Sequence, residues 1–523
     1  MRLKSLIIIA ILLALLISGC TTVKKPDLRI ISGSENEALE PIITEFEKKN
    51  NVEIEMVYKG SVDIMNMLGT SEIDEYDAVW PANSIWITMG DTEHKIKDMK
   101  SIMTSPIVFG IRKSLAEDLG FTKEETKVSD ILKAINDKKL KFIMTSATQS
   151  NSGACAYLGF LSALLDNPDT IKIEDLERKE IKEKLAQLLS GVNRSSGSSG
   201  WLKDLYLNGN YDAMVNYEAV IIETNQELIK QGREPLYAVY PVDGLAIADS
   251  PLGYVDNKDE KKAGLFLKFQ EYLLSENVQK QLSDLGRRTG TAGVNEDIRK
   301  DVFNKDWGID GKKVISGITM PSKKVIKKAL DMYQTELRKP SATVYCLDYS
   351  GSMAGEREKT LKNAMSSLLN QEEAKKHMIQ SSEKDIMIVI PFSDTILDTW
   401  EVKGNKEEEL DEILSKIQEM NVGGGTDIYT PALKGIEILD DPKYEEYSRA
   451  IVLLTDGESN EGMYFNEFSQ KFKELNTDIP VFAISFGSAD EQQLDDITTL
   501  TRAKVFDGKK DLGEAFKLVK GYN

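Results

Sequence analysis

Two hydrophobic patterns follow one another repeatedly along this chain. Residues 28–32 are mostly apolar and predict a strand, while residues 52–58 alternate between apolar and polar side chains and predict a second strand. Between them, residues 37–50 place Leu39, Ile42, Ile43 and Phe46 on one face of a predicted helix. A third short strand is predicted at residues 77–80. Repeated alternation of strands and helices predicts an α/β fold with a parallel sheet covered by helices.

The alternation stops once and then begins again. A predicted helix over residues 326–338 is followed by Pro340, a common stop signal after a helix. We therefore expect a first domain over 28–320, a connecting helix or linker over 321–340 and a second domain over 341–523. In the second domain, apolar runs predict buried strands at 342–347, 386–392, 451–455 and 481–486, and an amphipathic helix at 356–369.

The N-terminal segment combines a positively charged start, an apolar run and a cysteine. The apolar run over residues 6–17 is too short to span a bilayer comfortably, and small residues separate it from Cys20. This arrangement resembles the lipobox of bacterial lipoproteins, although Ile17 stands where leucine is usual. The resemblance implies a signal peptide over 1–19, a lipidated Cys20 and a polar tether over 20–27 outside the cytoplasm. The alternative is an uncleaved anchor helix.

Composition and charge exclude several classes of protein. Hydrophobic residues make up 41% of the 523 residues and charged residues 29%, which excludes wholesale disorder and a multi-span membrane protein. A net charge of −19 repels polyanions, so a nucleic-acid partner is not expected. The two histidines, His94 and His377, leave little for a His-based zinc site or a Ser-His-Asp triad. Three cysteines are too few for a disulfide framework, so we expect Cys155 and Cys346 to be separate buried thiols.

Small and polar residues gather where the predicted strands of the first domain end. In open α/β sheets, ligands sit at the carboxyl ends of strands, where loops and helix N-termini present unpaired N–H groups. A Ser- and Gly-rich segment at 191–200 is either a flexible linker or a further site of this kind. The candidate ligand contacts are Ser34, Ser61, Trp80, Ser146, Ser152, Asn216, Tyr217 and Asp243.

These strand-end segments resemble those of the extracellular solute-binding proteins of ABC importers, over roughly residues 28–320. The resemblance implies a two-lobed fold that closes on a small-molecule solute by a hinge motion, with an ABC permease as a further partner. Crossover strands are expected near 105–112 and 238–246. The lobes would then be 28–104 with 247–320, and 105–246.

Each candidate contact also has a purely structural interpretation. Serine and asparagine are common at helix caps and turns with no ligand present. The adjacent Arg287 and Arg288 could neutralise an anionic ligand, but a solvated basic turn is the simpler interpretation.

The second domain begins with a motif of metal-binding character. Its first strand ends in Asp348-Tyr349-Ser350-Gly351-Ser352, an Asp-x-Ser-x-Ser pattern. Farther along come Gly423-Gly424-Gly425-Thr426-Asp427 and a strand that ends at Asp456-Gly457. In this order the segments resemble the metal-ion-dependent adhesion site (MIDAS) of von Willebrand factor type A domains, over about residues 341–523. The resemblance implies a Rossmann-like fold.

The same resemblance implies a ligand set and a mode of binding. Ser350, Ser352 and Thr426 would offer neutral hydroxyls to Mg²⁺ (or Mn²⁺ or Ca²⁺), and Asp348 and Asp456 would supply charge, largely through bound water. A metal held this way stays electron-poor and can accept an acidic side chain from a partner protein. Asp427 is a candidate for indirect support only. The alternative is a strand-end turn with helix caps at Ser350 and Thr426.

Taken together, these features predict a surface lipoprotein with two binding modules and no enzymatic activity. One module would capture or sense a solute, and the other would hold a partner protein through the metal. The alternative is an adhesion or assembly factor whose solute-binding fold has no small-molecule ligand. An enzyme is disfavoured because the sequence has no nucleophile elbow, zinc motif, Walker loop or kinase signature.

Overall fold

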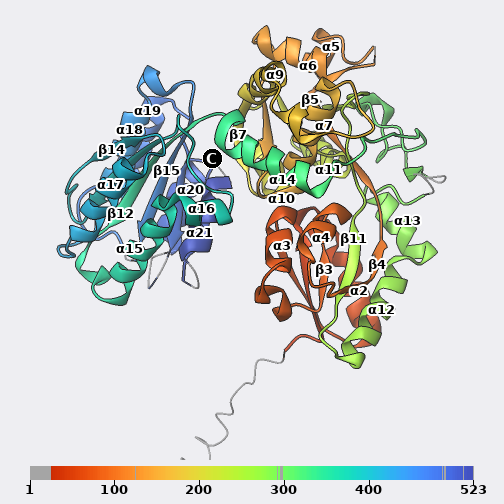
Figure 1. Ribbon diagram of the computed structural model, residues 1–523, viewed down its shortest axis with the longest axis horizontal. Helices are drawn as coiled ribbons and strands as arrows, with labels where there is room; N and C mark the ends of the chain where they lie inside the picture. The colour runs from red at the N-terminus through yellow and green to blue at the C-terminus, as the bar shows by residue number, and fades with distance from the viewer. Residues whose placement is uncertain are drawn as a thin grey trace, which may run out of the picture.

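Three β-sheets organise the chain, two in the first domain and one in the second (Figure 1). The computed structural model describes residues 25–123, 125–290, 293–294, 298–456, 458–485, 487, 491–509 and 512–521. The predicted signal peptide and the predicted lipidation residue, Cys20, lie outside the described residues. Among the helices that are described, none has both the length and the apolar character needed to cross a bilayer.

The first lobe is built on a five-stranded sheet in the order β2-β1-β3-β11-β4. β1 pairs in parallel with β2 and β3, as predicted, whereas β11 pairs antiparallel with β3 and β4. Leu39, Ile42 and Phe46, predicted to share a helix face, are buried together in the core of this lobe. The elements are β1 (Leu28–Gly33), η1 (Ser34–Leu39), α2 (Glu40–Asn50), β2 (Ile54–Lys59), α3 (Ser61–Leu68), η2 (Ser71–Glu75), β3 (Ala78–Trp80), α4 (Ser84–Gly90), β4 (Ile96–Ser101), β11 (Pro251–Val255), α12 (Glu260–Leu273) and α13 (Glu276–Asp284).

The second lobe has a sheet in the order β10-β5-β8-β6-β7, with β9 paired to β5. The Ser- and Gly-rich segment 191–200 forms β7 and the start of α10, so it is not a flexible linker. The elements are β5 (Ser105–Arg112), α5 (Lys113–Asp118), α6 (Val128–Asn136), β6 (Phe142–Thr145), α7 (Asn151–Leu164), α8 (Ile173–Leu176), α9 (Lys179–Ser190), β7 (Val192–Ser196), α10 (Ser199–Asn208), β8 (Ala213–Tyr217), α11 (Glu218–Lys230), β9 (Leu236–Val239) and β10 (Ile247–Ala248).

The chain crosses between the lobes a few residues away from the predicted places. Two crossings lie at 102–104, between β4 and β5, and at 249–250, between β10 and β11, and a third lies between α13 and η4. Residues 105–112 are themselves strand β5 of the second-lobe sheet. The prediction was wrong here because a strand that connects two sheets and a strand within one sheet have the same pattern of apolar residues.

The end of the predicted first lobe also packs elsewhere. α12 and α13 belong to the first-lobe core, but Val302, Phe303 and Trp307 are buried in the second lobe, and η4 (Lys305–Trp307) packs on β9. The assignment of 247–320 to the first lobe is therefore wrong for its last part. The predicted linker is likewise part of the second-lobe core, through α14 (Lys323–Met332) and the π-helix η5 (Tyr333–Leu337).

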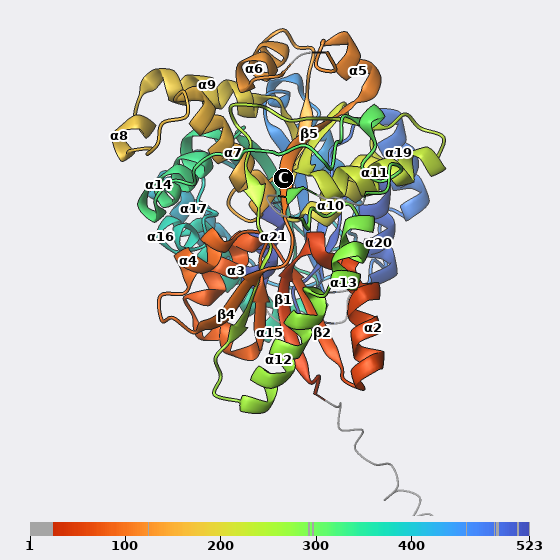
Figure 2. The ribbon, with the colours of Figure 1, turned by 90° about the vertical axis from the view of Figure 1, so that its right-hand side faces the viewer.

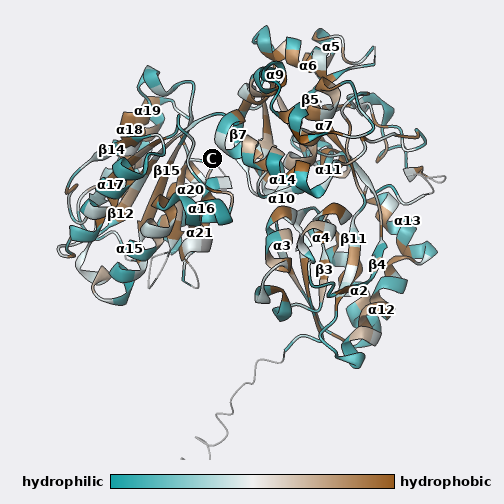
Figure 3. Ribbon diagram, viewed as in Figure 1, coloured by the Kyte–Doolittle hydropathy of each residue, from teal (hydrophilic) through white to brown (hydrophobic). Residues whose placement is uncertain are grey.

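The second domain is a six-stranded sheet covered by helices on both faces (Figures 1 and 3). Its order is β14-β13-β12-β15-β16-β17, with every pair parallel except β13 with β14. Along β12, Tyr345 and Leu347 enter one hydrophobic core while Val344 and Cys346 enter the other, the period of two expected for a strand. The described strands are β12 (Ser341–Asp348), β13 (Ile386–Phe392), β14 (Trp400–Lys403), β15 (Ser448–Thr455), β16 (Val481–Ser485) and β17 (Val505–Asp507).

The helices divide between the two faces of this sheet. α15, α17 and α21 share one core, and α18, α19 and α20 share the other. Their bounds are α15 (Glu356–Leu369), α16 (Gln371–Lys376), α17 (Glu407–Glu419), α18 (Tyr429–Leu439), α19 (Phe465–Leu475), α20 (Glu491–Leu500) and α21 (Leu512–Gly521), with short 3-10 turns η6 (Gly351–Met353) and η7 (Pro442–Tyr444). Cys155 and Cys346 are separate, buried free thiols, which confirms the prediction for them.

Candidate metal centre and solute cleft

The candidate metal centre lies at the carboxyl ends of two neighbouring parallel strands. Asp348 is the last residue of β12, and Asp456 follows the end of the adjacent β15. Both carboxylates are fully buried. Asp348 accepts hydrogen bonds from the Ser350 backbone N–H at 2.8 Å and from the Thr455 hydroxyl at 2.6 Å. Burial raises the pKa of Asp348, while these hydrogen bonds act to lower it.

Two of the three predicted hydroxyl groups stand directly beside these carboxylates. Ser350 Oγ and Ser352 Oγ lie 3.0 Å apart, and Ser352 Oγ donates to Asp456 Oδ1 at 2.8 Å. Gly351 N donates to Gly424 O at 3.1 Å, which draws the glycine-rich loop onto the Asp-x-Ser-x-Ser turn. Ser352 and Asp456 are 104 residues apart in the sequence, so the fold brings two distant segments together at this centre.

Thr426 and Asp427 are placed by the same loop. Thr426 is buried, and its backbone N–H donates to Asn460 Oδ1 at 3.1 Å. Asp427 accepts from the backbone N–H groups of Tyr429 and Thr430, both at 3.1 Å, at the start of α18. Asp427 is therefore a helix-capping residue that holds Thr426 in place.

Arg357 is a residue of this centre that the sequence analysis did not identify. From the first turn of α15, its NH1 group donates to Asp456 Oδ2 and, at 3.2 Å, to Ser352 O. The only hint in the sequence that Arg357 belongs to this centre is its position shortly after the Asp-x-Ser-x-Ser motif. A divalent cation at the centre would compete with this guanidinium for Asp456.

The donor set fits a hard cation. Within the described residues, no three His, Cys, Asp or Glu side chains gather as a metal-binding group. An ion at the centre would therefore depend on the Ser and Thr hydroxyls as well as the two carboxylates. Oxygen ligands with few carboxylates suit Mg²⁺, which keeps several waters.

A second polar cluster lies in the first domain, on the second-lobe side of the boundary where the two lobes meet, which is called the cleft below. Ser152 Oγ lies 2.8 Å from both Thr145 Oγ1 and Ser199 Oγ. Asn216 Nδ2 donates to Ser199 O at 3.0 Å. The Tyr217 hydroxyl accepts from Asn151 at 3.0 Å, and its burial raises its pKa. The structure thus brings Ser152, Asn216 and Tyr217 together, at the carboxyl ends of β6 and β8 and the N-termini of α7 and α10.

The two lobes touch one another directly across the cleft. The Gly200 backbone N–H of the second lobe donates to Ser34 Oγ of the first at 3.3 Å. The Val62 backbone N–H donates to Gln149 O at 3.0 Å, and a Cβ on Gly60 would clash with the same carbonyl. The structure is therefore a closed form, with Ser34 at the contact between the lobes.

The remaining candidate contacts have local structural partners. Ser61 Oγ accepts from Ala82 N at 3.0 Å, and Ser146 Oγ lies 3.0 Å from Thr148 Oγ1. Trp80 packs in the first-lobe core and donates to Ser250 at 3.0 Å, so it does not join the polar cluster. Asp243 accepts from Val128 N at 2.9 Å at the start of α6 and does not join it either.

Glu35 and Asn36 were not predicted, yet they carry buried acceptor atoms at the first-lobe side. Glu35 Oε1 and Asn36 Oδ1 receive no hydrogen bond from any described residue. Burial raises the pKa of Glu35 to about 7, partly offset by a hydrogen bond from its own backbone N–H to the carboxylate and by the charge of Arg287. The charge of Glu35 also acts on Tyr217, which places it near the polar cluster.

The two adjacent arginines do not form the expected solvated turn. Arg288 and Glu218 form a buried ion pair at 2.8 Å, with exposed fractions of 3% and 0%. The Tyr240 hydroxyl donates to the same Glu218 carboxylate, and Arg287 pairs with Glu223 at 2.6 Å. The prediction was wrong because both carboxylates belong to α11, far from the arginines in the sequence. Glu218, for example, lies 70 residues before Arg288.

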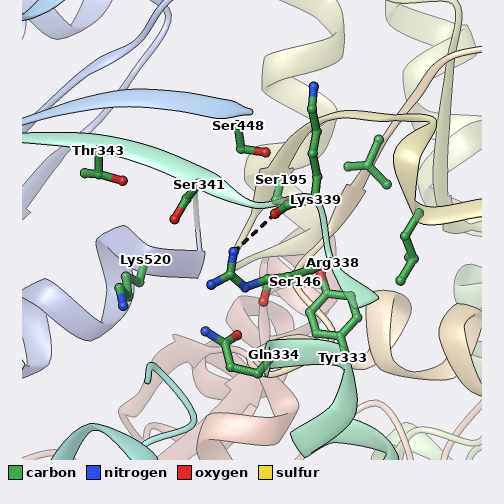
Figure 4. A pocket seen from close by; sticks show the side chains of 12 residues that line it. Ser146, Ser195, Tyr333, Gln334, Arg338, Lys339, Ser341, Thr343, Ser448 and Lys520 are labelled. Carbon is green, nitrogen blue, oxygen red and sulfur yellow. Dashed lines mark hydrogen bonds between the residues drawn. The ribbon is translucent and has the colours of Figure 1, made fainter. Parts of the chain in front are cut away.

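A small polar cavity of about 40 Å³ lies where the two domains join (Figure 4). Ser146 and Tyr333 line it from the first domain, and Ser341, Ser448 and Lys520 line it from the second. Arg338 enters the same space and forms a buried ion pair with Asp385 at 2.5 Å. Burial lowers the pKa of Lys520 to about 8, because the charged form is poorly solvated there.

Comparisons with known proteins cover both domains. A family model described as bacterial extracellular solute-binding protein matches residues 28–288, and a von Willebrand factor type A domain model matches residues 344–518. A von Willebrand factor A domain-containing protein from Dictyostelium discoideum is 30% identical over 131 residues, which is 25% of this chain and 14% of that protein. The chain thus matches about one seventh of that relative's length.

Solved structures similar to the chain include a ferric binding protein from Campylobacter jejuni, with 19% identity and a TM-score of 0.43 over 58% of this chain and 98% of that one. A periplasmic thiamin binding protein has 12% identity and a TM-score of 0.45 over 58% of this chain and 94% of that one. The predicted fold class, a two-lobed periplasmic-binding-protein-like fold followed by a Rossmann-like domain, is confirmed. The chain therefore joins a bacterial extracellular solute-binding domain to a C-terminal von Willebrand factor type A domain.

Proposed function

We propose that this protein is a membrane-anchored extracytoplasmic receptor that binds a small solute in its first domain and a protein partner, through Mg²⁺, in its second. The observation that carries the proposal is the pair of polar sites, each at the carboxyl ends of parallel strands in a separate domain. Both roles are binding roles. Turnover that disappears in Asp348→Ala would contradict them.

The cleft chemistry favours a solute that carries N–H or O–H donors. Glu35 Oε1 and Asn36 Oδ1 are buried acceptors, and the Ser152, Ser199 and Asn216 cluster can supply both donors and acceptors. A buried acceptor left without a donor costs free energy, so a donor group on the solute would stabilise the closed lobes.

We expect Glu35→Gln to weaken solute binding. A thermal-shift screen of the full chain against amines, amino acids, sugars and oxyanions would identify the solute, since a ligand at 100 times its Kd stabilises by about 2.7 kcal/mol. For that solute, replacing the carboxylate by a neutral amide should raise Kd roughly tenfold or more at pH 8, where Glu35 is mainly charged. The measurement is isothermal titration calorimetry.

Glu40→Gln is the matched control, because Glu40 is exposed at the start of α2 and accepts from Tyr58 instead. Equal affinities for all three proteins would place the solute away from Glu35. A screen with no hit on the folded chain would support the alternative function, an adhesion or assembly factor. The direct contacts that close the two lobes favour that alternative.

Membrane attachment through Cys20 is the third part of the proposal. We expect Cys20→Ser to move the protein from the membrane fraction to the soluble fraction, because a serine hydroxyl cannot replace the lipidated thiol. Fractionation and immunoblotting would measure this. Retention of Cys20→Ser in the membrane would indicate an uncleaved anchor helix instead.

A further inference from the structure

The last described helix, α21, makes contacts through two of its faces. Leu512, Ala515, Phe516 and Val519 are buried in one hydrophobic core of the second domain. Lys517 lies on a different face of the same helix and reaches the first domain. Figure 1 shows α21 on the side of the second domain that faces the first, and Figure 2, viewed from the side of the first domain, shows the second domain behind it.

Lys517 is bound to the first lobe by a buried ion pair. Its Nζ lies 3.1 Å from Asp63 Oδ1, and the two side chains are only 6% and 3% exposed. Asp63 is in the first turn of α3, directly after Gly60 and Val62, which contact the other lobe. Replacing one partner of such a pair leaves the other charge buried beside a neutral side chain, which is destabilising, so variants at either residue report on this contact.

The same lysine is bound to the second lobe through its backbone. Gln149 Nε2 donates to Lys517 O at 2.5 Å, and a Cβ on Gly521 would clash with the Gln149 side chain. Gln149 is also the residue whose carbonyl accepts the hydrogen bond from Val62 across the cleft. Lys517 therefore contacts both lobes where they meet each other.

Other contacts attach the second domain to the second lobe. Arg194 NH2 donates to Arg502 O at 3.0 Å and its guanidinium lies 6.0 Å from the Phe482 ring centroid. Trp201 packs on the same ring, with centroids 6.4 Å apart. The covalent connection through α14 and η5 is also packed into the second lobe. The Lys517–Asp63 pair, in contrast, ties this assembly to the first lobe.

We propose that α21 is an intramolecular latch that keeps the two lobes closed. If the second domain moves with the second lobe, opening the cleft pulls Asp63 away from Lys517 and breaks the contact between these two buried charges. Undocking of the second domain would then control solute exchange. This last step rests on the proposed solute function, whereas the latch itself does not.

Hydrogen–deuterium exchange of the full chain, without added solute, tests the latch. The readout is exchange in peptides that contain Val62 and Gly200, whose amides bond across the cleft. In Lys517→Met and in Asp63→Asn, these amides should exchange about tenfold faster or more, while the β12 amides stay protected. Lys471→Met, in an exposed pair with Glu467, is the control and should leave exchange unchanged.

Native protection of both cleft amides in the two variants, with β12 also protected, would overturn the latch. Small-angle scattering that shows an undocked second domain beside a protected cleft would do the same, because the contact would then serve domain docking alone. A failed solute screen would not bear on this result, since no solute is used.

Discussion

Replacing Asp348 and Ser350 together by alanine is expected to abolish Mg²⁺ binding to the second domain. Asp348 is fully buried and hydrogen-bonded to the Ser350 backbone and Thr455, and Ser350 Oγ lies 3.0 Å from Ser352 Oγ. The double variant would remove one of two charges and one of three hydroxyls from a donor set that is already poor in carboxylates. Calorimetric titration of the full chain with MgCl₂ and with MnCl₂ measures the effect.

A matched control removes the same two residue types from elsewhere in the domain. Asp411 and Ser415 are exposed on α17, one helical turn apart, and their double alanine variant should bind Mg²⁺ as the unchanged protein does. Undiminished Mg²⁺ binding in the Asp348 and Ser350 variant would remove the basis for the proposed metal centre.

Asp385→Ala is expected to destabilise the protein by about 3–5 kcal/mol, because it leaves a buried guanidinium without its counter-charge. Asp385 pairs with Arg338 and also accepts from the Ser341 and Ser382 backbone N–H groups, both at 2.8 Å. These groups lie where the first domain ends and the second begins. Urea unfolding followed by tryptophan fluorescence gives the change in midpoint.

The exposed pair of Glu373 with Lys376 provides the comparison, and Glu373→Ala should leave the midpoint unchanged. Replacing both Arg338 and Asp385 with apolar residues of similar size should recover much of the loss, since neither charge is then buried alone. A midpoint for Asp385→Ala equal to that of the unchanged protein would show that the pair contributes nothing.

The same ion pair predicts a dependence of stability on pH. Burial acts to raise the pKa of Asp385, but Arg338 and the hydrogen bonds outweigh it and lower the pKa from 3.8 to about 2. A folded-state pKa below the unfolded value stabilises the protein above about pH 4, and this contribution is lost as the pH falls toward 2. The amount is about 2 kcal/mol. Asp385→Asn should remove this part of the acid dependence in urea titrations from pH 5 to pH 2.

The local patterns of the sequence predicted alternating strands and helices in both domains, whereas the two lobes of the first domain were implied by its resemblance to solute-binding proteins. Alternating strands and amphipathic helices identified β1, α2 and β12, because side-chain periodicity follows directly from backbone geometry. The order of Asp348, Thr426 and Asp456 gave the resemblance to the metal-type motif; Asp348 ends β12, Asp456 follows β15, and Thr426 lies in the loop between α17 and α18. Short-range physics decides all of these features.

Long-range contacts were beyond the sequence patterns. Arg288 looked like part of a solvated turn, yet it is buried against Glu218; the segment around Phe303 was assigned to the wrong lobe. In each case the deciding partner is distant in the chain, and composition near the residue does not reveal it. An apolar run such as residues 105–112 can connect two sheets or belong to one of them. The surface against which it packs decides between the two, and local sequence does not show that surface.

The sequence alone therefore determined that the chain has two α/β domains, because alternating strands and helices follow from local periodicity, and its resemblance to a known motif pointed to the candidate metal residues. The tertiary structure decided that Arg357 pairs with Asp456, that Glu35 carries a buried acceptor, and that Lys517 meets Asp63 across the domains. These pairings depend on desolvation, and only the complete packing of the chain decides which charges leave water together.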